Sequence, residues 1–222
     1  MQNQTENQII LVDKPAGISS FGVVAKVRGY LKATYGHKIK VGHTGTLDPF
    51  ATGLLILLTG KMTKKSNEFL KKDKVYEATL KLGYTSTTGD PEGEITNTSD
   101  SIPTLKNVQT IASSFIGEIE QKVPTFSAVK INGERAYKLA RKGVDFETPT
   151  RKVTIYNIEI LKYDYPKLNI CCHVSSGTYI RTLAEDIGEK LGTGAYLTAL
   201  RRTKIADYSV TDALPLSHFT QE

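Results

Sequence analysis

The order of secondary-structure patterns constrains this fold most, because strand and helix patterns are mixed without a regular strand–helix–strand repeat. Residues 75–82 alternate between apolar and polar, as in a half-buried strand, and residues 53–59 form an apolar run typical of a buried strand. Residues 153–161 and 168–174 predict two paired strands joined by a short connection. We therefore expect an α+β fold with a mixed, mostly antiparallel central sheet and flanking helices.

Helical spacing appears in several other segments. Ser19 or Ser20 can cap a helix whose apolar positions begin at Phe21, and Gly36 ends it. Further helices are predicted over residues 63–72, 105–115, 134–142 and 180–191. The segment 85–100 is rich in Thr, Ser, Gly and Asp, which is typical of an exposed loop.

The distribution of charge favours a polyanionic partner. The net charge is +6 and the sequence pI is about 9.1. The basic residues gather in three stretches, at 61–74, at 130–152 and at Arg201, Arg202 and Lys204. One such stretch can be a solvated surface, but three together favour nucleic acid, whose phosphates bind positioned Lys and Arg side chains.

Several other classes of protein are disfavoured. No apolar run approaches the ~18 residues of a membrane span. The polar residues 1–8 do not resemble a secretion signal, and Cys171 and Cys172 are neighbours that would point to opposite faces of a strand. These features predict a cytoplasmic protein. The histidines lack metal-ligand spacing and no phosphate-binding loop is present, so we expect neither a metal nor a cofactor.

Asp48 is the first candidate for chemistry. It ends a loop rich in glycine and threonine, and Pro49 follows it directly. Glycines allow a ligand to approach the backbone closely, and the proline restricts the conformation of the acid before it. This arrangement would hold a carboxylate rigidly at the edge of a cleft. The alternative is an ordinary turn residue, because Asp-Pro is common in turns.

Two further groups of residues are candidates with open alternatives. Tyr179 and Arg181 stand at a predicted strand-to-helix junction, where Arg181 could pair with a carboxylate and keep it ionised, or simply lie on the surface. Tyr76 could stack on a base or transfer a proton, although a tyrosine in a strand is more commonly part of the core.

Taken in order along the chain, these motifs resemble those of the TruB family, the tRNA pseudouridine-55 synthases. The matching motifs include Val12-Asp13-Lys14-Pro15-Ala16-Gly17, Gly42-His43-Thr44-Gly45-Thr46-Leu47-Asp48-Pro49, Lys74-Val75-Tyr76, Pro124-Thr125-Phe126-Ser127-Ala128-Val129-Lys130, Gly177-Thr178-Tyr179-Ile180-Arg181 and Leu200-Arg201-Arg202-Thr203. They span almost the whole chain. At 125 and 126 the chain carries Thr and Phe where the family more often has Pro and Tyr.

The resemblance implies a pseudouridine synthase fold with an RNA-binding cleft, and isomerisation of uridine 55 in the T loop of tRNA. It also implies a role for each of eight residues. Asp48 would be the essential carboxylate, Arg181 would pair with it, and Tyr76 would stack on the flipped base and help to remove its C5 proton. Tyr179 and Leu200 would line the base pocket, and His43 would fill the space that the base leaves. Lys14 and Lys130, which lie in the matching motifs, are predicted to bind the substrate.

The resemblance also bears on domains and partners. Residues 1–222 are expected to form a single catalytic domain, without the C-terminal RNA-binding (PUA) domain that many members carry. The expected partner is tRNA, and a monomer is the default expectation. Two alternatives stay open. One is a synthase acting on another RNA, including the relative that works with a guide RNA, and the other is a non-catalytic module that helps tRNA to fold.

Overall fold

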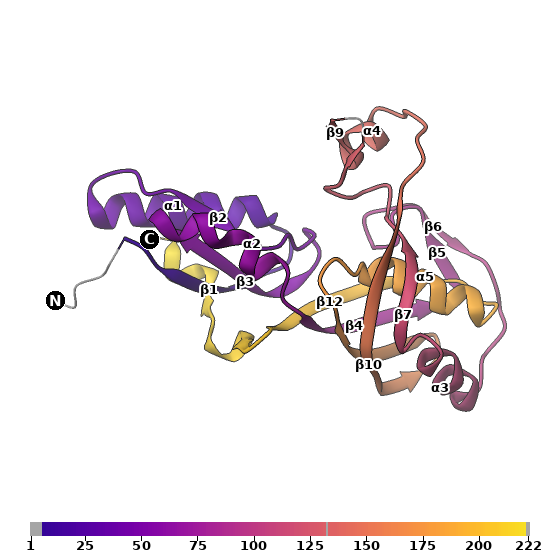
Figure 1. The fold of residues 1–222 in the computed structure, drawn as a ribbon. Coiled ribbons are helices and arrows are strands. Elements are labelled where there is room, and N and C mark those ends of the chain that lie inside the picture. The colour runs from indigo at the N-terminus through magenta and orange to yellow at the C-terminus, as the bar shows by residue number, and fades with distance from the viewer. Residues whose placement is uncertain (1–5, 132, 221–222) are drawn as a thin grey trace. The chain divides into compact units, whose positions relative to one another are not determined.

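Strands and helices follow one another along the chain as Figure 1 shows, and the computed structural model describes residues 6–131 and 133–220. Residues 1–5 of the polar N-terminal segment are thus outside the described part. The chain divides into two compact units, one of residues 1–77 and 200–222 and the other of residues 78–199. We call them unit 1 and unit 2. Whether they act as one catalytic domain stays a prediction.

Unit 1 is built around the buried strand that the sequence predicts. Its sheet order is β14-β1-β3-β12, with β2 also paired to β3. The strands are β1 (Ile9–Lys14), β2 (Val41–His43), β3 (Thr52–Thr59), the end of β12 (Ala195–Ile205) and β14 (Leu214–Pro215). Leu55 and Leu57 of β3 pack with one apolar cluster, and Leu54, Ile56 and Leu58 with another. Both faces of β3 are therefore covered, which explains its continuous apolar run.

Helix α1 (Ser20–Tyr35) supplies the first of these clusters through Val23, Val24, Val27 and Leu31. The predicted helix ends are confirmed: Ser19 caps the first turn by accepting a hydrogen bond from the Gly22 amide, and Gly36 is left-handed with φ 78°. Phe21, which we expected on the apolar face, is instead exposed. The Arg28 guanidinium lies 6.0 Å from its ring centroid.

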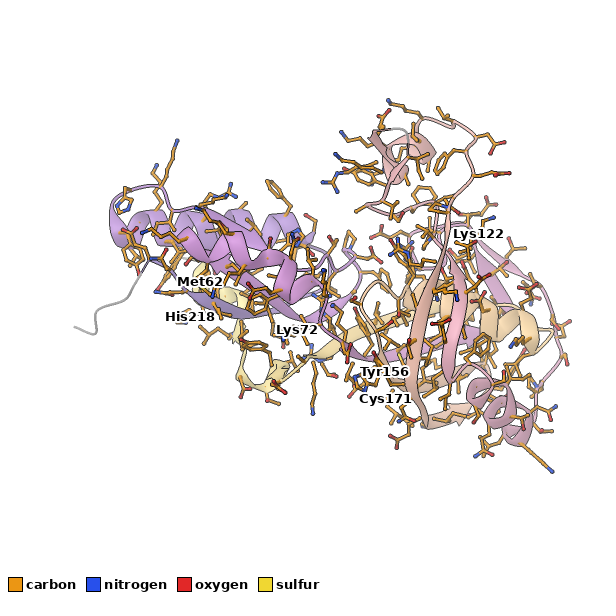
Figure 2. The ribbon with its side chains drawn as sticks, viewed as in Figure 1. Met62, Lys72, Lys122, Tyr156, Cys171 and His218 are labelled. Atoms are coloured by element: carbon orange, nitrogen blue, oxygen red, sulfur yellow. The ribbon has the colours of Figure 1, made fainter. Side chains whose placement is uncertain are left out.

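Unit 2 contains the predicted antiparallel pair. Its sheet order is β12-β4-β11-β10-β7, and β10 pairs antiparallel with both β11 and β7. The elements are the later part of β4 (Lys74–Leu82), whose first four residues belong to unit 1, and β7 (Gly117–Lys122), β10 (Thr150–Asp164), β11 (Lys167–Val174), α3 (Leu105–Ser113) and α5 (Ile180–Lys190). Figure 2 labels Tyr156 on β10 and Cys171 on β11. Cys172 is buried whereas Cys171 is half-buried, as expected for neighbours on opposite faces of a strand.

The remaining elements are short. They are η1 (Gly60–Lys65), α2 (Ser66–Leu70), β5 (Tyr84–Ser86), β6 (Ile95–Asn97), β8 (Lys130–Ile131), β9 (Glu134–Arg135), α4 (Ala136–Arg141), β13 (Tyr208–Ser209), η2 (Val210–Asp212) and η3 (Leu216–Phe219). No helix of the described residues is long and apolar enough to span a membrane. The architecture is α+β with a mostly antiparallel sheet, so the predicted fold class is confirmed.

Three local predictions differ from the structure. The predicted loop 85–100 contains a hairpin of β5 and β6, whose strands are only three residues each. The predicted helix 63–72 begins earlier, as the 3-10 turn η1, before the short α2. Strand β7 was not predicted, because its sequence is Gly-Glu-Ile-Glu-Gln-Lys and the one side chain it buries is the polar Gln121. Its pairing with β10 defines it instead.

Candidate active site

Asp48 lies on the loop between β2 and β3, and buried groups hold the backbone beside it. The Ser20 hydroxyl donates to the carbonyl of Leu47 at 2.9 Å and accepts from its amide at 2.8 Å. The Thr44 amide donates to the Ile56 carbonyl at 3.0 Å, which ties the start of the loop to β3. The residue before Asp48 is thus fixed by two hydrogen bonds to one helix residue. This fixed backbone is what a precisely placed carboxylate requires.

Lys14 holds the other end of the same loop. Its side chain is fully buried, and its ammonium donates to the carbonyls of Pro15 and Ile18 at 2.8 Å and of Pro49 at 3.1 Å. A buried ammonium must be hydrogen-bonded, and these carbonyls meet that need. These contacts give the Lys14 ammonium a place within the fold, holding the loop. Its predicted direct binding of the substrate stays a prediction.

His43 ends β2, at the start of the loop. It is half-buried, and its Nδ1 accepts a hydrogen bond from the Gly45 amide at 3.4 Å. The imidazole is therefore oriented by the loop that it precedes. Its predicted role in filling the space left by a flipped base stays a prediction.

The third basic stretch is largely committed to contacts within unit 1. Arg201 forms a two-point ion pair with the Asp13 carboxylate, with N–O distances of 3.0 and 2.8 Å. Arg202 is fully buried and donates to the carbonyls of Leu54 and Gly45. Of the three cations that we expected to meet nucleic acid, Lys204 alone is exposed. The expectation therefore fails for Arg202, because burial removes it from any phosphate.

Tyr76 and Lys74 share a face of β4, since alternate residues of a strand point the same way. Both are buried. The Lys74 ammonium donates to the carbonyls of Leu70 and Lys72, which it caps after the short helix α2. Burial, together with the positive charge of Arg202, lowers the pKa of Lys74 from 10.5 to about 8. Leu200, also predicted to meet the base, is a buried residue of β12.

The lowered pKa of Lys74 predicts a pH-dependent stability. The unfolded chain keeps the ordinary pKa of 10.5, so between about pH 8 and 10.5 it binds more protons than the folded chain does. The free energy of unfolding should therefore rise with pH across this window. Below about pH 8 Lys74 is protonated in both states, so it adds no pH dependence there. We expect the stability of wild type relative to Lys74→Met to increase by roughly 1–2 kcal/mol between pH 8 and 10.

Denaturant unfolding of both proteins at each pH measures this difference, with the exposed Lys71→Met as the control for loss of one lysine. The lowered pKa would be contradicted if the stability of wild type relative to Lys74→Met did not change with pH. It would also be contradicted if that change were the same for Lys71→Met.

Arg181 lies in the first turn of α5 in unit 2 and is almost entirely buried. Its Nη1 donates to the Thr88 carbonyl at 2.9 Å and its Nη2 to the Phe126 carbonyl at 2.8 Å. The buried Asp90 carboxylate lies 3.6 Å from Nη1, and the Thr88 hydroxyl donates to that carboxylate at 2.6 Å. Arg181 thus lies beside one carboxylate, that of Asp90, and not on the surface. Its pairing with Asp48 joins residues of different units and stays a prediction.

Tyr179, the residue before α5, is held by a buried glutamine. The Gln121 side chain accepts from the Tyr179 amide at 2.7 Å and donates to its carbonyl at 3.0 Å. The Arg151 guanidinium lies 5.1 Å from the Tyr179 ring centroid. We did not identify Gln121 or Asp90 from the sequence. Gln121 is 58 residues from its partner and Asp90 lies in a predicted loop, so no local pattern marks either.

Lys130 lies on β8, in an excursion of unit 2 between β7 and β10 that also contains β9 and α4 (Figure 1). Exposed cations of this excursion are Lys130, Arg135, Lys138, Arg141 and Lys142. Glu134 pairs with Lys142 at 2.7 Å. The others keep a basic surface that suits a phosphate backbone.

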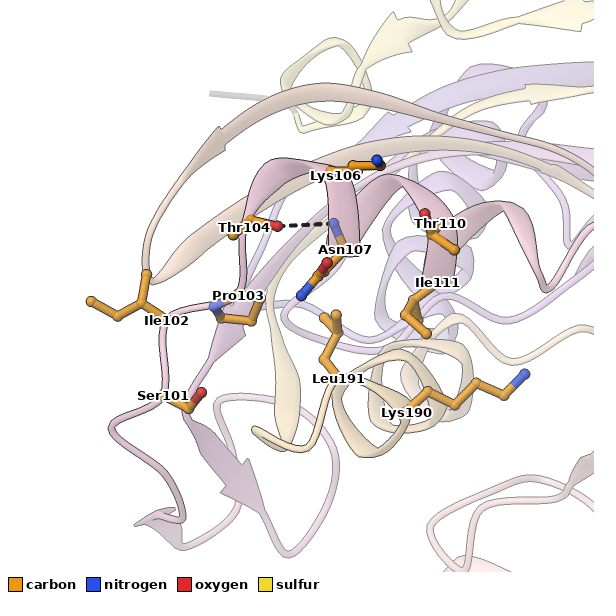
Figure 3. Close-up of a pocket in the computed structure, with 10 residues that line it drawn as sticks. All are labelled: Ser101, Ile102, Pro103, Thr104, Lys106, Asn107, Thr110, Ile111, Lys190 and Leu191. Atoms are coloured by element: carbon orange, nitrogen blue, oxygen red, sulfur yellow. Dashed lines mark hydrogen bonds between the residues drawn. The ribbon is translucent and has the colours of Figure 1, made fainter.

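A pocket of about 340 Å³ lies in unit 2 (Figure 3). It is formed by the start of α3 and the end of α5, where Lys190 and Leu191 contribute to the wall. The Thr104 hydroxyl, drawn in Figure 3, accepts from the Asn107 amide as the cap of α3. None of the eight predicted site residues lines this pocket, so it does not mark the candidate site.

Comparison with known proteins agrees with the motifs. Residues 32–180 match the N-terminal domain of the TruB family pseudouridylate synthases, and residues 181–222 match the tRNA pseudouridylate synthase B C-terminal domain. The protein named tRNA pseudouridine synthase B of Phocaeicola vulgatus is 46% identical, over 99% of this chain and 94% of its own length. The namesake of Neisseria meningitidis serogroup B is 45% identical, over 96% of this chain and 67% of its own.

Solved structures agree as well. A Cbf5-Nop10-Gar1 complex contains a chain that is 30% identical, with a TM-score of 0.71 over 96% of this chain. An H/ACA RNP bound to a substrate RNA containing 2′-deoxyuridine contains another, 26% identical with a TM-score of 0.69. This chain spans about half the length of those two chains. The family match, the sequence identity and the fold together show that the chain belongs to the TruB family of pseudouridylate synthases.

Proposed function

We propose that this protein converts uridine 55 in the T loop of tRNA into pseudouridine, with Asp48 as its catalytic carboxylate. The observation that carries the proposal is the fixed loop of Asp48, held at Leu47 by Ser20 and at Pro49 by Lys14. The loop has the family's motif, and relatives named tRNA pseudouridine synthase B match nearly the whole chain.

The reaction is an isomerisation, so nothing is gained or lost overall. The bond between N1 of the base and C1′ of the ribose breaks, the base turns, and C5 joins to C1′ while the C5 proton leaves and N1 gains one. An ionised carboxylate can serve by attacking C1′, by attacking the base or by removing a sugar proton. All three routes need a negatively charged oxygen, and we propose that the Asp48 carboxylate supplies it.

The other predicted residues act on the substrate around that charge. A uridine within the folded T loop must be flipped out, at a cost of a few kcal/mol. Tyr76 is proposed to stack on the extruded base, Leu200 and Tyr179 to line its pocket, and His43 to fill the space it leaves. Arg181 is proposed to pair with Asp48. Lys130 and its exposed neighbours are proposed to bind backbone phosphates, which position an RNA without reading its sequence.

The setting of the reaction is part of the proposal. We infer a monomer that acts in the cytoplasm on tRNA, with residues 1–222 working as one catalytic domain. Selectivity would come mostly from the folded shape of the RNA, because few base contacts are available around one flipped nucleotide.

The direct test is to incubate the protein with unmodified tRNA and to map pseudouridine chemically along the whole RNA. We expect product at uridine 55 and none in a matched tRNA that carries cytidine there. Product at other uridines would favour a different RNA substrate. Tight tRNA binding with no product would favour a non-catalytic role in tRNA folding, and either result would overturn the proposal.

A further inference from the structure

Arg202 is one of the largest fully buried side chains of the protein. Burying a guanidinium is costly unless its donors are hydrogen-bonded. Its Nε donates to the Leu54 carbonyl at 2.8 Å and its Nη2 donates to the Gly45 carbonyl at 3.0 Å. Leu54 belongs to β3, whereas Gly45 belongs to the loop that carries Asp48. One guanidinium therefore ties that loop to the buried strand.

The backbone of Arg202 is paired with a strand residue that has no room for a side chain. Arg202 is in register with Gly53 in the parallel pair of β12 and β3. A Cβ added at Gly53 would lie 2.3 Å from the Arg202 carbonyl oxygen and 2.8 Å from its amide nitrogen. Gly53 also has φ +102°, a conformation that other residues rarely adopt. The glycine thus leaves room for the Arg202 backbone beside β3. Because that backbone is paired with β3, the Cα from which the Arg202 side chain extends is held in place.

Three buried side chains from other segments anchor the loop. Arg202 binds the carbonyl of Gly45, Ser20 binds both backbone groups of Leu47, and Lys14 binds the carbonyl of Pro49. Asp48 lies between the second and third of these. We propose that Arg202 is a positioning residue for the isomerisation, which holds the start of the catalytic loop and so sets the position of the Asp48 carboxylate.

The chemistry of the side chain fits this role better than a lysine would. A guanidinium is planar and presents several donors in a rigid fork, whereas an ammonium is a compact charge on a flexible stem. Two carbonyls on different segments can be held in one fixed geometry by the fork. The Lys74 side chain lies close by, since its Cε is 4.0 Å from a Cβ position at Gly45.

The inference rests on the proposed function, and its test uses the full chain with Arg202→Lys and Arg202→Gln. Single-turnover rates on unmodified tRNA should fall roughly 10–100-fold, because a shift of about 1 Å in a catalytic group can cost that much. The affinity for tRNA should change less than about twofold, since a buried side chain makes no phosphate contact. Amides of residues 44–47 should exchange hydrogen faster in both variants.

Arg28→Lys is the matched control. This arginine also binds a backbone carbonyl, that of Val41 at 3.2 Å, but none of residues 44–47, so its variant should keep the wild-type rate and the wild-type exchange of residues 44–47. Rates are expressed per folded molecule, with the folded fraction taken from the unfolding curve of each variant.

Three results would overturn the inference. Weaker tRNA binding with an unchanged single-turnover rate would make Arg202 a phosphate contact. A normal rate per folded molecule would show that Arg202 only stabilises the fold. Unchanged hydrogen exchange of residues 44–47 would show that Arg202 does not hold the loop. Wild type without any product would instead contradict the proposed function, and hydrogen exchange would still test the contact of Arg202 with the loop.

Discussion

Asp48→Asn is expected to abolish pseudouridine formation, with a loss of roughly 10⁴-fold or more in the single-turnover rate. The amide has nearly the shape of the carboxylate, and the contacts of Ser20 and Lys14 that hold the loop involve the backbone of its neighbours. The loop should therefore keep its conformation while the negative charge is lost. A neutral amide can neither attack the ribose or base nor serve as the general base.

Rapid mixing with excess enzyme measures this rate, and a filter-binding assay on the same tRNA measures affinity, which should stay within about threefold of wild type. Asp207→Asn is the matched control, because Asp207 is an exposed residue of the same unit. It should retain full activity. A variant lacking the Asp48 carboxylate that still turned over within tenfold of wild type would remove Asp48 from the chemistry.

Local sequence patterns predicted the elements in which the type of each residue follows from its place in the element or from its burial. Helix α1 has a serine and a glycine at its two ends, and both act as caps. Strand β3 is apolar throughout because both of its faces are covered, and β4 alternates because one of its faces is. In each case the physical cause acts within the segment itself, so the sequence of the segment is enough.

Burial of charge could not be predicted in the same way. Lys14 and Arg202 were counted among cations that meet RNA, yet both lie inside unit 1 and bind backbone carbonyls. The acceptor atoms are in other segments, up to 157 residues away in the case of Gly45. Carbonyls occur at every residue and carry no mark in the sequence. Only the folded backbone shows which of them converge on a cation.

The same limit applied to Arg181. The sequence suggested a carboxylate partner, and the resemblance suggested Asp48, while Asp90 in a predicted loop went unnoticed. Asp90 is 91 residues earlier in the chain, and the folding of the β5–β6 hairpin region brings it to α5. Arg181 therefore contacts a carboxylate and two carbonyls that belong to residues outside its own motif, so the motif alone could not predict them.

Arg181→Lys should lower the single-turnover rate roughly 10²–10³-fold while leaving tRNA affinity within about threefold. Two nitrogens of Arg181 bind the carbonyls of Thr88 and Phe126, and a single ammonium cannot hold both in the same geometry. Arg28→Lys is the control, because Arg28 is half-buried and binds the Val41 carbonyl at 3.2 Å outside the proposed machinery. Equal losses of rate and affinity in Arg181→Lys would contradict a role in catalysis.

Arg181→Gln separates the geometry of the guanidinium from its charge. If Arg181 pairs with Asp48, its positive charge favours the ionised carboxylate, which must be ionised to act. The acid limb of the pH–rate profile should then move to higher pH in Arg181→Gln and stay in place in Arg181→Lys, which keeps the charge. If both variants lost rate but the acid limb stayed in place in both, Arg181 would act only through Asp90 and the carbonyls of unit 2. The pairing with Asp48 would then be wrong.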